Sequence, residues 1–510
     1  MPLRKGGGTR VRLSISGLKT AAVLSLAAPT VLFYLTHLRW YFGLLSSAVL
    51  GAAVFFYRKG LNDERPAELP GKADGDAFEL SPGSLLFCLL AAAAWTYLSG
   101  IGGFFAQSLD FNNRNAILHD LLDHPWPVYF PETDSALTYY LGYWILPALL
   151  GKGGGLLFGP AFAWTLANLM QFLQTVWLLL LAFLLLLSYL RRGEHVAGIV
   201  LLFIFFSGMD GLICFLREEW SPHIEWWSVT WEYPSMTTSL FWVYNQAVPA
   251  WIMTLLFLHS AGDIRTYALI GLICLPYAPF PLVGLVVLCA GCFCVALVRN
   301  RNRKAVWKMV FSPENLLAVL GMIPMLLFLT SNHAVGGDPF HVEMYREYYP
   351  TLGNYLYKYV LFLGIEWGIY AAILFSRFRK DPVFLLSCAS LALIPLFQMG
   401  ANYNDFVMRA STPALTLLCV YCIRFLTQPS PRQRRLLSWA LAAALTIGAL
   451  TGATEMKRGF AEFRLNGYRP VVRDEYGSVL NAKEEVNYFL CTDVSDSFFY
   501  RVLAKQRENR

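Results

Sequence analysis

The chain has 510 residues, of which 56% are hydrophobic and only 15% are charged, and its formal net charge is +7 at neutral pH. A soluble protein of this length needs more charged surface, whereas repeated apolar runs of about 17–25 residues match the thickness of a bilayer core. This composition excludes a soluble enzyme and predicts an all-α polytopic membrane protein. The excess of lysine and arginine does not indicate nucleic-acid binding, because most of these residues fall in the connections on one side of the membrane.

Residues 1–80 predict an N-terminal transmembrane hairpin followed by a cytoplasmic linker. The first 19 residues are basic and lead into apolar runs at 20–36 and 40–57, which is typical of a signal-anchor rather than a cleaved signal peptide. Residues 58–80 are rich in charge, proline and glycine and form the linker. The apolar run 84–105 then leads to the first large loop.

Loop 106–136 is the polar segment around which the chain is organised. It contains NNRNAILHDLLDH, which the proline-rich PWP stretch ends. Four apolar side chains of this stretch share one side of a helix: Ile117, Leu118, Leu121 and Leu122. We therefore predict an amphipathic helix at the membrane surface.

The apolar runs from residue 136 to residue 450 complete a predicted set of about 12 to 14 spans. Run 156–190 is too long for one simple span, so its number of passes stays open. The GKGGG stretch at residues 151–155 lacks the Lys-Ser/Thr of a phosphate-binding loop and is interpreted as a turn.

Connections rich in lysine and arginine alternate with loops that are poor in them. Because cytoplasmic connections carry the excess of cations, this alternation predicts a cytoplasmic N-terminus and external loops at 106–136, 210–236 and 331–354. Residues 455–510 then form a small external C-terminal tail that lies on the surface. The expected location is a cell membrane, namely the bacterial cytoplasmic membrane.

Acidic residues lie where apolar runs meet the outward loops. Asp110 and Asp210 each follow the end of an apolar run, and Asp405 precedes a late one. An ionisable group at such a place is costly unless it is paired or hydrated, and a carboxylate beside an acceptor hydroxyl or amine can act as a general base. We therefore predict Asp110 and Asp210 as catalytic residues. The structural alternatives are a membrane-border residue for Asp110 and a helix-end carboxylate for Asp210.

Further polar residues in and near these loops are predicted to bind substrate: Asn113, Arg114, His223, Glu225, Asn245, Gln246, Asp405 and Arg409. A guanidinium group suits phosphate oxygens, so Arg114 or Arg409 would hold a phosphate. Two alternatives stay open. Asp405 and Arg409 are one helical turn apart and suit a plain ion pair. The amides of Asn245 and Gln246 lie inside an apolar run, where such groups more often join helices.

A divalent cation, Mg²⁺ or Mn²⁺, is a further expectation, with Asp110, Asp210 and His223 as its ligands. Residues His333, Asp338, His341 and Glu343 are interpreted instead as a solvated external loop. The tryptophans of the second external loop suit an interfacial belt or a platform for stacking a sugar: Trp220, Trp226, Trp227 and Trp231.

The first loop resembles that of the GT-C superfamily of membrane glycosyltransferases, which includes protein O-mannosyltransferases, aminoarabinose transferases and the catalytic subunits of oligosaccharyltransferases. The resemblance rests on Asp110 after a span, the helix, the PWP stretch and the entry Tyr139-Tyr140, and on Ser207-Gly208-Met209-Asp210 in the next external region. It implies a GT-C-like transmembrane domain over 81–454, Asp110 as the catalytic acidic residue, acting as a base or metal ligand, and a polyprenyl-phosphate-linked sugar as donor. Many members carry two neighbouring acids in this loop, whereas here Phe111, Asn112 and Asn113 follow Asp110.

The leading hypothesis is an inverting glycosyltransferase that moves a sugar from a polyprenyl-phosphate donor to an envelope glycan, lipid or protein on the outer face. A transporter or flippase for a lipid-linked or polar solute is the first alternative, and a non-catalytic membrane assembly protein is the second. A cavity shared by Asp110 and Asp210 would favour the enzyme, and a large separation of the two would favour the assembly protein.

Overall fold

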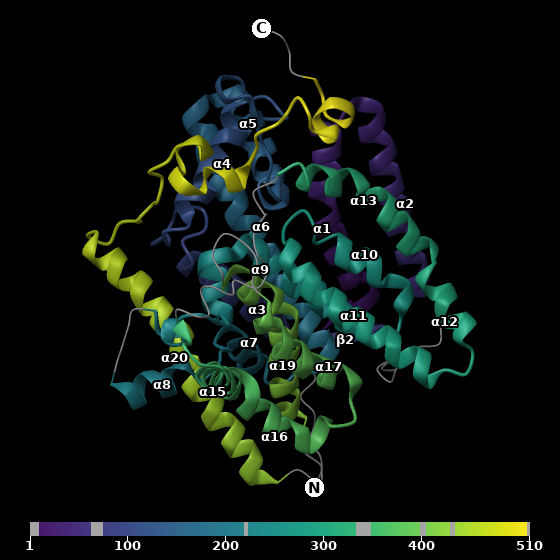
Figure 1. Ribbon diagram of the computed structural model, residues 1–510, viewed down its shortest axis with the longest axis vertical. Helices are drawn as coiled ribbons and strands as arrows, with labels where there is room; N and C mark the ends of the chain where they lie inside the picture. Colours follow the sequence, from purple (N-terminus) through teal and green to yellow (C-terminus); the bar gives the residue numbers. More distant parts are fainter. Residues whose placement is uncertain are drawn as a thin grey trace.

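The computed structural model describes residues 10–62, 75–218, 223–332, 348–397, 404–428 and 434–506, which are mostly helical (Figure 1). Among these residues, eight helical segments are long and apolar enough to cross a bilayer: α1 (Ile15–His37), α2 (Trp40–Asn62), α6 (Pro160–Leu190), α9 (Met236–His259), α11 (Pro279–Arg299), Arg303–Leu329, Leu352–Phe378 and α20 (Arg435–Leu465). The predicted class, a helical multi-span membrane protein, is confirmed.

Two of these segments contain more than one helix, and shorter helices complete the described chain. Arg303–Leu329 comprises α12 (Arg303–Val310) and α13 (Pro313–Leu329), and Leu352–Phe378 comprises α15 (Leu352–Leu363) and α16 (Ile369–Phe378). The shorter apolar helices are α3 (Pro82–Leu98), α5 (Ile145–Phe158), α17 (Pro382–Leu393) and α19 (Thr412–Thr427). The others are α4 (Phe111–Asp123), α7 (Val196–Ile204), α8 (Asp210–Arg217), α10 (Tyr267–Leu272) and α18 (Asn404–Ala410).

Helix α9 lies at the centre of the molecule (Figure 1), packed against α6, α19 and α20, and nearly all of its side chains are buried. It is two helical segments joined at Val243, whose backbone angles (φ −134°, ψ 39°) leave the helical region. A backbone break in a buried helix frees main-chain groups and opens space beside it. The candidate site lies beside this kink.

The long run 156–190 forms a single helix, α6, and the glycine-rich stretch before it is helical as well. Residues 151–155 lie inside α5, so their interpretation as a turn is wrong. A Cβ on Gly151 would lie 2.8 Å from the carbonyl oxygen of Ala163 in α6, and one on Gly155 would lie 2.8 Å from the Ala163 Cβ. The glycines therefore serve close packing of two helices, the role of small residues in membrane helices.

The N-terminal hairpin is packed into the same body as the later spans. Strand β1 (Val11–Ser14) pairs antiparallel with β2 (Ala77–Leu80), directly before α3. The Tyr34 hydroxyl of α1 donates a 2.7 Å hydrogen bond to the Gly321 carbonyl of α13. A buried side-chain bond of this kind joins residues 1–80 to the domain predicted to begin at residue 81.

Helix α4 is present where the periodicity predicts it, and the C-terminal segment lies beside it (Figure 1) and hydrogen-bonds its polar side chains. Asp120 accepts a 2.9 Å hydrogen bond from the backbone N–H of Val479. Strand β5 (Leu490–Cys491) adds to β4 (Ser135–Leu137), which pairs with β3 (Tyr129–Phe130). Phe499 and Tyr500 are buried.

The C-terminal residues thus differ from the expected surface-lying tail. Helix α20 crosses residue 454 without a break, and the segment after it supplies core side chains and a strand. Its burial is driven by the apolar side chains that were visible only as short patches in the sequence. Most of the predicted loop 331–354, with His333, Asp338, His341 and Glu343, lies outside the described residues.

Candidate functional site

A cavity of about 210 Å³ lies between α4, the loop before α9, α9 itself, and helices α11, α18 and α19. Six ionisable side chains line it: Asp110, His223, Glu225, Glu232, Asp405 and Arg409. Gln246, Trp226 and Trp242 add an amide and two aromatic rings. Of the residues predicted for the site, the cavity brings together Asp110, His223, Glu225, Gln246, Asp405 and Arg409.

Asp110 is the residue before α4, and its side chain remains 40% exposed. Its carboxylate forms a 3.0 Å ion pair with Arg114, which lies one helical turn later. The Arg114 side chain is only 7% exposed. The Arg114 guanidinium also donates to the Trp242 carbonyl and lies over the Tyr244 ring, 5.7 Å from its centroid. Arg114 therefore orients Asp110 through the ion pair and does not itself line the cavity.

Asp405 and Arg409 form the ion pair that their spacing in α18 predicts. Both side chains are 15% exposed, and both line the cavity as well. The ion pair and a role in binding are thus compatible. Arg409 is the arginine that the cavity wall offers to an anionic group, and guanidinium groups bind phosphate oxygens in a planar, two-point manner.

Glu225 and Glu232 bring two more carboxylates to the cavity from the loop before α9. The Glu225 carboxylate accepts a 2.6 Å hydrogen bond from the backbone N–H of Ser235. Burial, with the charges of Glu232 and Asp210, raises the pKa of Glu225 well above its usual range. Burial likewise raises the pKa of Glu232 to about 8. Glu232 was missed in the sequence, where the only signal is an acid between Trp231 and Tyr233 in a cation-poor loop.

Asp210 does not line the cavity, so it does not meet Asp110 there as predicted. It is buried, and its carboxylate accepts hydrogen bonds from Ser207 (3.2 Å), Thr451 (2.9 Å) and the Trp227 indole (3.0 Å). Burial raises its pKa. The same indole N–H lies 2.9 Å from a Glu366 carboxylate oxygen. The side chain turns towards α20 and the loop, a direction that a position at the end of a span does not reveal.

The predicted metal ligands are consequently not assembled. Asp110 and His223 line the cavity, whereas Asp210 is held among its own partners elsewhere. Within the described ranges, no group of three or more His, Cys, Asp or Glu side chains is placed to hold a metal ion. The predicted set of ligands, Asp110, Asp210 and His223, therefore does not form one site in this structure.

The remaining predicted residues lie outside the cavity wall. Asn113 donates to the Glu485 carboxylate of the C-terminal segment. Asn245 is fully buried in α9, and both polar atoms of its amide lack a hydrogen-bond partner within the described part of the chain. Of the tryptophans, Trp226 lines the cavity and Trp231 is a core residue, while Trp220 lies outside the described residues.

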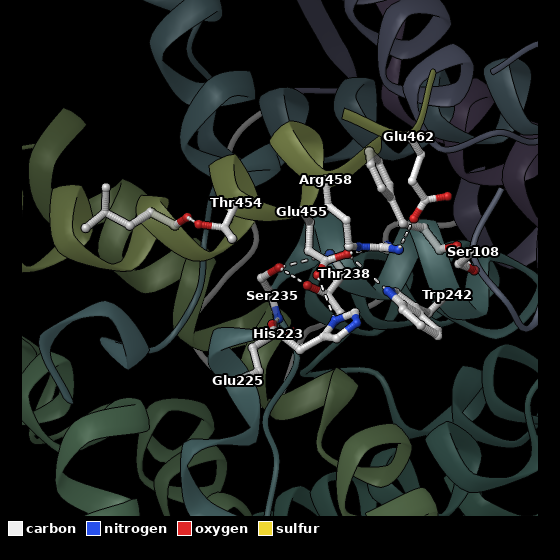
Figure 2. Close-up of polar contacts among 12 residues, drawn as sticks. Ser108, His223, Glu225, Ser235, Thr238, Trp242, Thr454, Glu455, Arg458 and Glu462 are labelled. Carbon is white, nitrogen blue, oxygen red and sulfur yellow. Dashed lines mark hydrogen bonds and ion pairs between the residues drawn. The ribbon is translucent and has the colours of Figure 1, made fainter. Parts of the chain in front are cut away.

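Figure 2 shows three side chains converging on the Glu455 carboxylate of α20. His223 Nδ1 lies 3.2 Å from it, the Trp242 indole donates at 3.1 Å, and Arg458 pairs with it at 2.8 Å. Arg458 also pairs with Glu462 at 3.3 Å and stacks on the Trp242 ring. His223 and Trp242 line the cavity, whereas Glu455 does not. Glu455 therefore holds two lining side chains in position without lining the cavity itself.

Replacing Glu455 with alanine is expected to lower the free energy of unfolding by about 3 kcal/mol, because it breaks a buried charge network and leaves polar partners unsatisfied. The matched control is Glu462→Ala, which removes a second, more exposed carboxylate (27% exposed) from the same arginine. It should cost less than about 1 kcal/mol. Denaturant unfolding in mixed micelles measures both. Equal costs for the two variants would contradict the central place of Glu455.

Comparison of this chain with protein-family models, with curated proteins and with solved structures found no match.

Proposed function

We propose that this protein is a membrane glycosyltransferase that moves a sugar from a polyprenyl-phosphate-linked donor to an acceptor in the cell envelope. The observation that supports the proposal is the cavity, whose lining includes both the partly exposed Asp110 and Arg409. A general base and a phosphate-binding group are the two functions that such a transfer requires of a protein.

In the proposed reaction Asp110 removes the proton of the acceptor nucleophile as that nucleophile attacks the anomeric carbon. The bond from the anomeric carbon to the phosphate oxygen breaks on the opposite side, which inverts the configuration, and the lipid phosphate leaves against Arg409. Arg114 keeps Asp110 oriented through their 3.0 Å ion pair. The Trp226 and Trp242 rings offer faces on which a sugar can stack.

The surroundings of the cavity support a lipid-linked donor. Its wall includes Pro281 of α11 and Thr412 of α19, both in helices of apolar character, so a polyprenyl chain can approach from the bilayer while its phosphate reaches Arg409. The proposed orientation places this end of the protein outside the cell and the basic connections in the cytoplasm, following the distribution of lysine and arginine.

A transporter for a polar or lipid-linked solute is the second candidate, and one observation favours it. Asn245 has a buried amide with neither polar atom bonded within the described residues, in the central and kinked helix α9. Buried polar groups without partners are costly, and polar side chains inside apolar helices can line solute pathways in transporters.

The experiment is transfer of radiolabelled sugar from a panel of polyprenyl-phosphate donors, with membranes that contain the protein compared with membranes that lack it. Protein-dependent incorporation into envelope lipid, glycan or protein, with release of the lipid phosphate, is the expected result. No incorporation from any donor, together with protein-dependent uptake of the same donors or sugars into vesicles, would overturn the enzyme in favour of the transporter.

A further inference from the structure

The acidic residues of the cavity differ in whether a basic side chain neutralises their charge. Asp110 and Asp405 each have an arginine of their own helix as an ion-pair partner. Glu232 is only 7% exposed and lines the cavity, yet no described residue makes a side-chain hydrogen bond or ion pair with it. The cation that acts electrostatically on Glu232 is Arg409. Arg409 already forms an ion pair with Asp405. A buried carboxylate in this position lacks a counter-charge of its own.

Gln246 also lines this cavity and carries an acceptor without a partner, independently of the acids. Gln246 is 3% exposed and lines the cavity, and its Nε2 donates a 3.0 Å hydrogen bond to the Tyr140 hydroxyl. The other polar atom of this amide, Oε1, is buried and has no hydrogen-bond partner within the described residues. A buried carbonyl oxygen without a donor costs free energy, so this atom also calls for a hydrogen-bond donor from outside the chain.

We propose that the cavity binds its substrate through a protonated primary amine, with Glu232 and Glu225 as the counter-charge and the Oε1 of Gln246 as a further acceptor. An ammonium group has three N–H donors and a full positive charge. It can therefore supply both a counter-charge for Glu232 and a hydrogen-bond donor for the Oε1 of Gln246. A neutral hydroxyl supplies no counter-charge to the ionised form of Glu232. A bare divalent ion would need a set of ligands that the described residues do not assemble.

This inference rests on the proposed function, because it takes the cavity as the substrate site, and it narrows the substrate class. The amine belongs either to an amino sugar on the lipid-linked donor or to an aminoalkyl headgroup on the acceptor. The recognition chemistry is the same for both sources, and matched pairs of probes separate them.

Binding of the amine should depend on pH through Glu232. With its pKa raised to about 8, Glu232 is protonated in the empty cavity at neutral pH, so a bound ammonium must displace that proton. For the aminoalkyl probe, phosphoethanolamine, the affinity should therefore rise with pH up to about 8 and fall near pH 10, where the amine loses its own proton. The charged groups that act on Glu232 in this range are Glu225, Asp210, Arg409, Glu455 and Asp405.

The test is titration calorimetry of the full-length protein in nanodiscs with two pairs of probes: glucosamine against N-acetylglucosamine, and phosphoethanolamine against its N-acetyl derivative. We expect the amine of at least one pair to bind about tenfold or more tightly than its uncharged partner. Repeating the titration in buffers of different ionisation enthalpy should show a net release of protons on amine binding at neutral pH. The pair that shows the preference identifies the source of the amine.

Glu232→Gln should abolish the preference for the amine over the N-acetyl probe. Glu218→Gln, the same change at an exposed position preceding the same loop, is the control and should behave as wild type. Gln246→Leu is the second variant, should Glu232→Gln fail to fold, and it should weaken amine binding by about threefold to tenfold.

Equal affinity for amine and N-acetyl probes in both pairs, or an unchanged preference in Glu232→Gln, would overturn the inference. Sugar transfer from a donor and acceptor that both lack an amine would also overturn it while leaving the glycosyltransferase proposal intact. Tight binding of the amine without transfer from any donor would overturn the glycosyltransferase proposal and leave amine recognition standing.

Discussion

Replacement of Asp110 by asparagine should lower the rate of sugar transfer by about 100-fold or more, the size of effect that removal of a general base produces. The substitution keeps the shape of the side chain and an oxygen that can accept the bond from Arg114, but it removes the basic carboxylate. Initial rates at saturating donor measure the effect, with the level of folded protein in the membrane measured alongside.

The matched control for this variant is Asp123→Asn, the same change at the exposed C-terminal end of α4. Asp123 does not line the cavity, so its variant should transfer sugar at the wild-type rate. Equal rates for Asp110→Asn and wild type would remove Asp110 from the chemistry. Glu225 would then be the carboxylate to test next, because it lines the same cavity.

Gly284→Ala should destabilise the protein by about 3 kcal/mol, because a methyl group cannot fit between α11 and the end of α18. A Cβ on Gly284 would overlap the backbone carbonyl of Ala410, with the carbonyl carbon only 2.9 Å away. Backbone atoms inside a packed bundle cannot move as the end of a flexible side chain can. Since Ala410 follows Arg409, the same displacement should also weaken the binding of a phosphate-bearing donor.

The control for Gly284→Ala is Gly153→Ala in α5, where an added Cβ meets no other atom within 4 Å. That variant should be neutral, or more stable by up to about 1 kcal/mol, because alanine favours a helix more than glycine does. Thermal unfolding in the same detergent compares the two. A neutral Gly284→Ala would show that α11 and α18 can separate without cost and that their contact does not position Arg409.

The sequence by itself determined the properties that depend on composition or on residues close together along the chain. The apolar runs predict a helical multi-span membrane protein, because a bilayer demands long apolar helices whatever their arrangement. Periodicity within one segment predicts α4, and a spacing of four residues predicts the Asp405–Arg409 ion pair. The acids flanking the first loop and the late span also indicated part of the cavity, Asp110 and Asp405.

Only the tertiary structure decided how distant segments meet. His223 and Glu455 are 232 residues apart in the chain, and no local pattern links them. Asp210 has the same sequence context as Asp110, but packing turns its carboxylate to Thr451 and Trp227 instead of the cavity. The 151–155 glycines are helical because α6 packs closely against them, which overrides their local preference for turns. Side-chain direction and helix contacts arise from the packing of the whole bundle, and a linear pattern of residue types does not contain them.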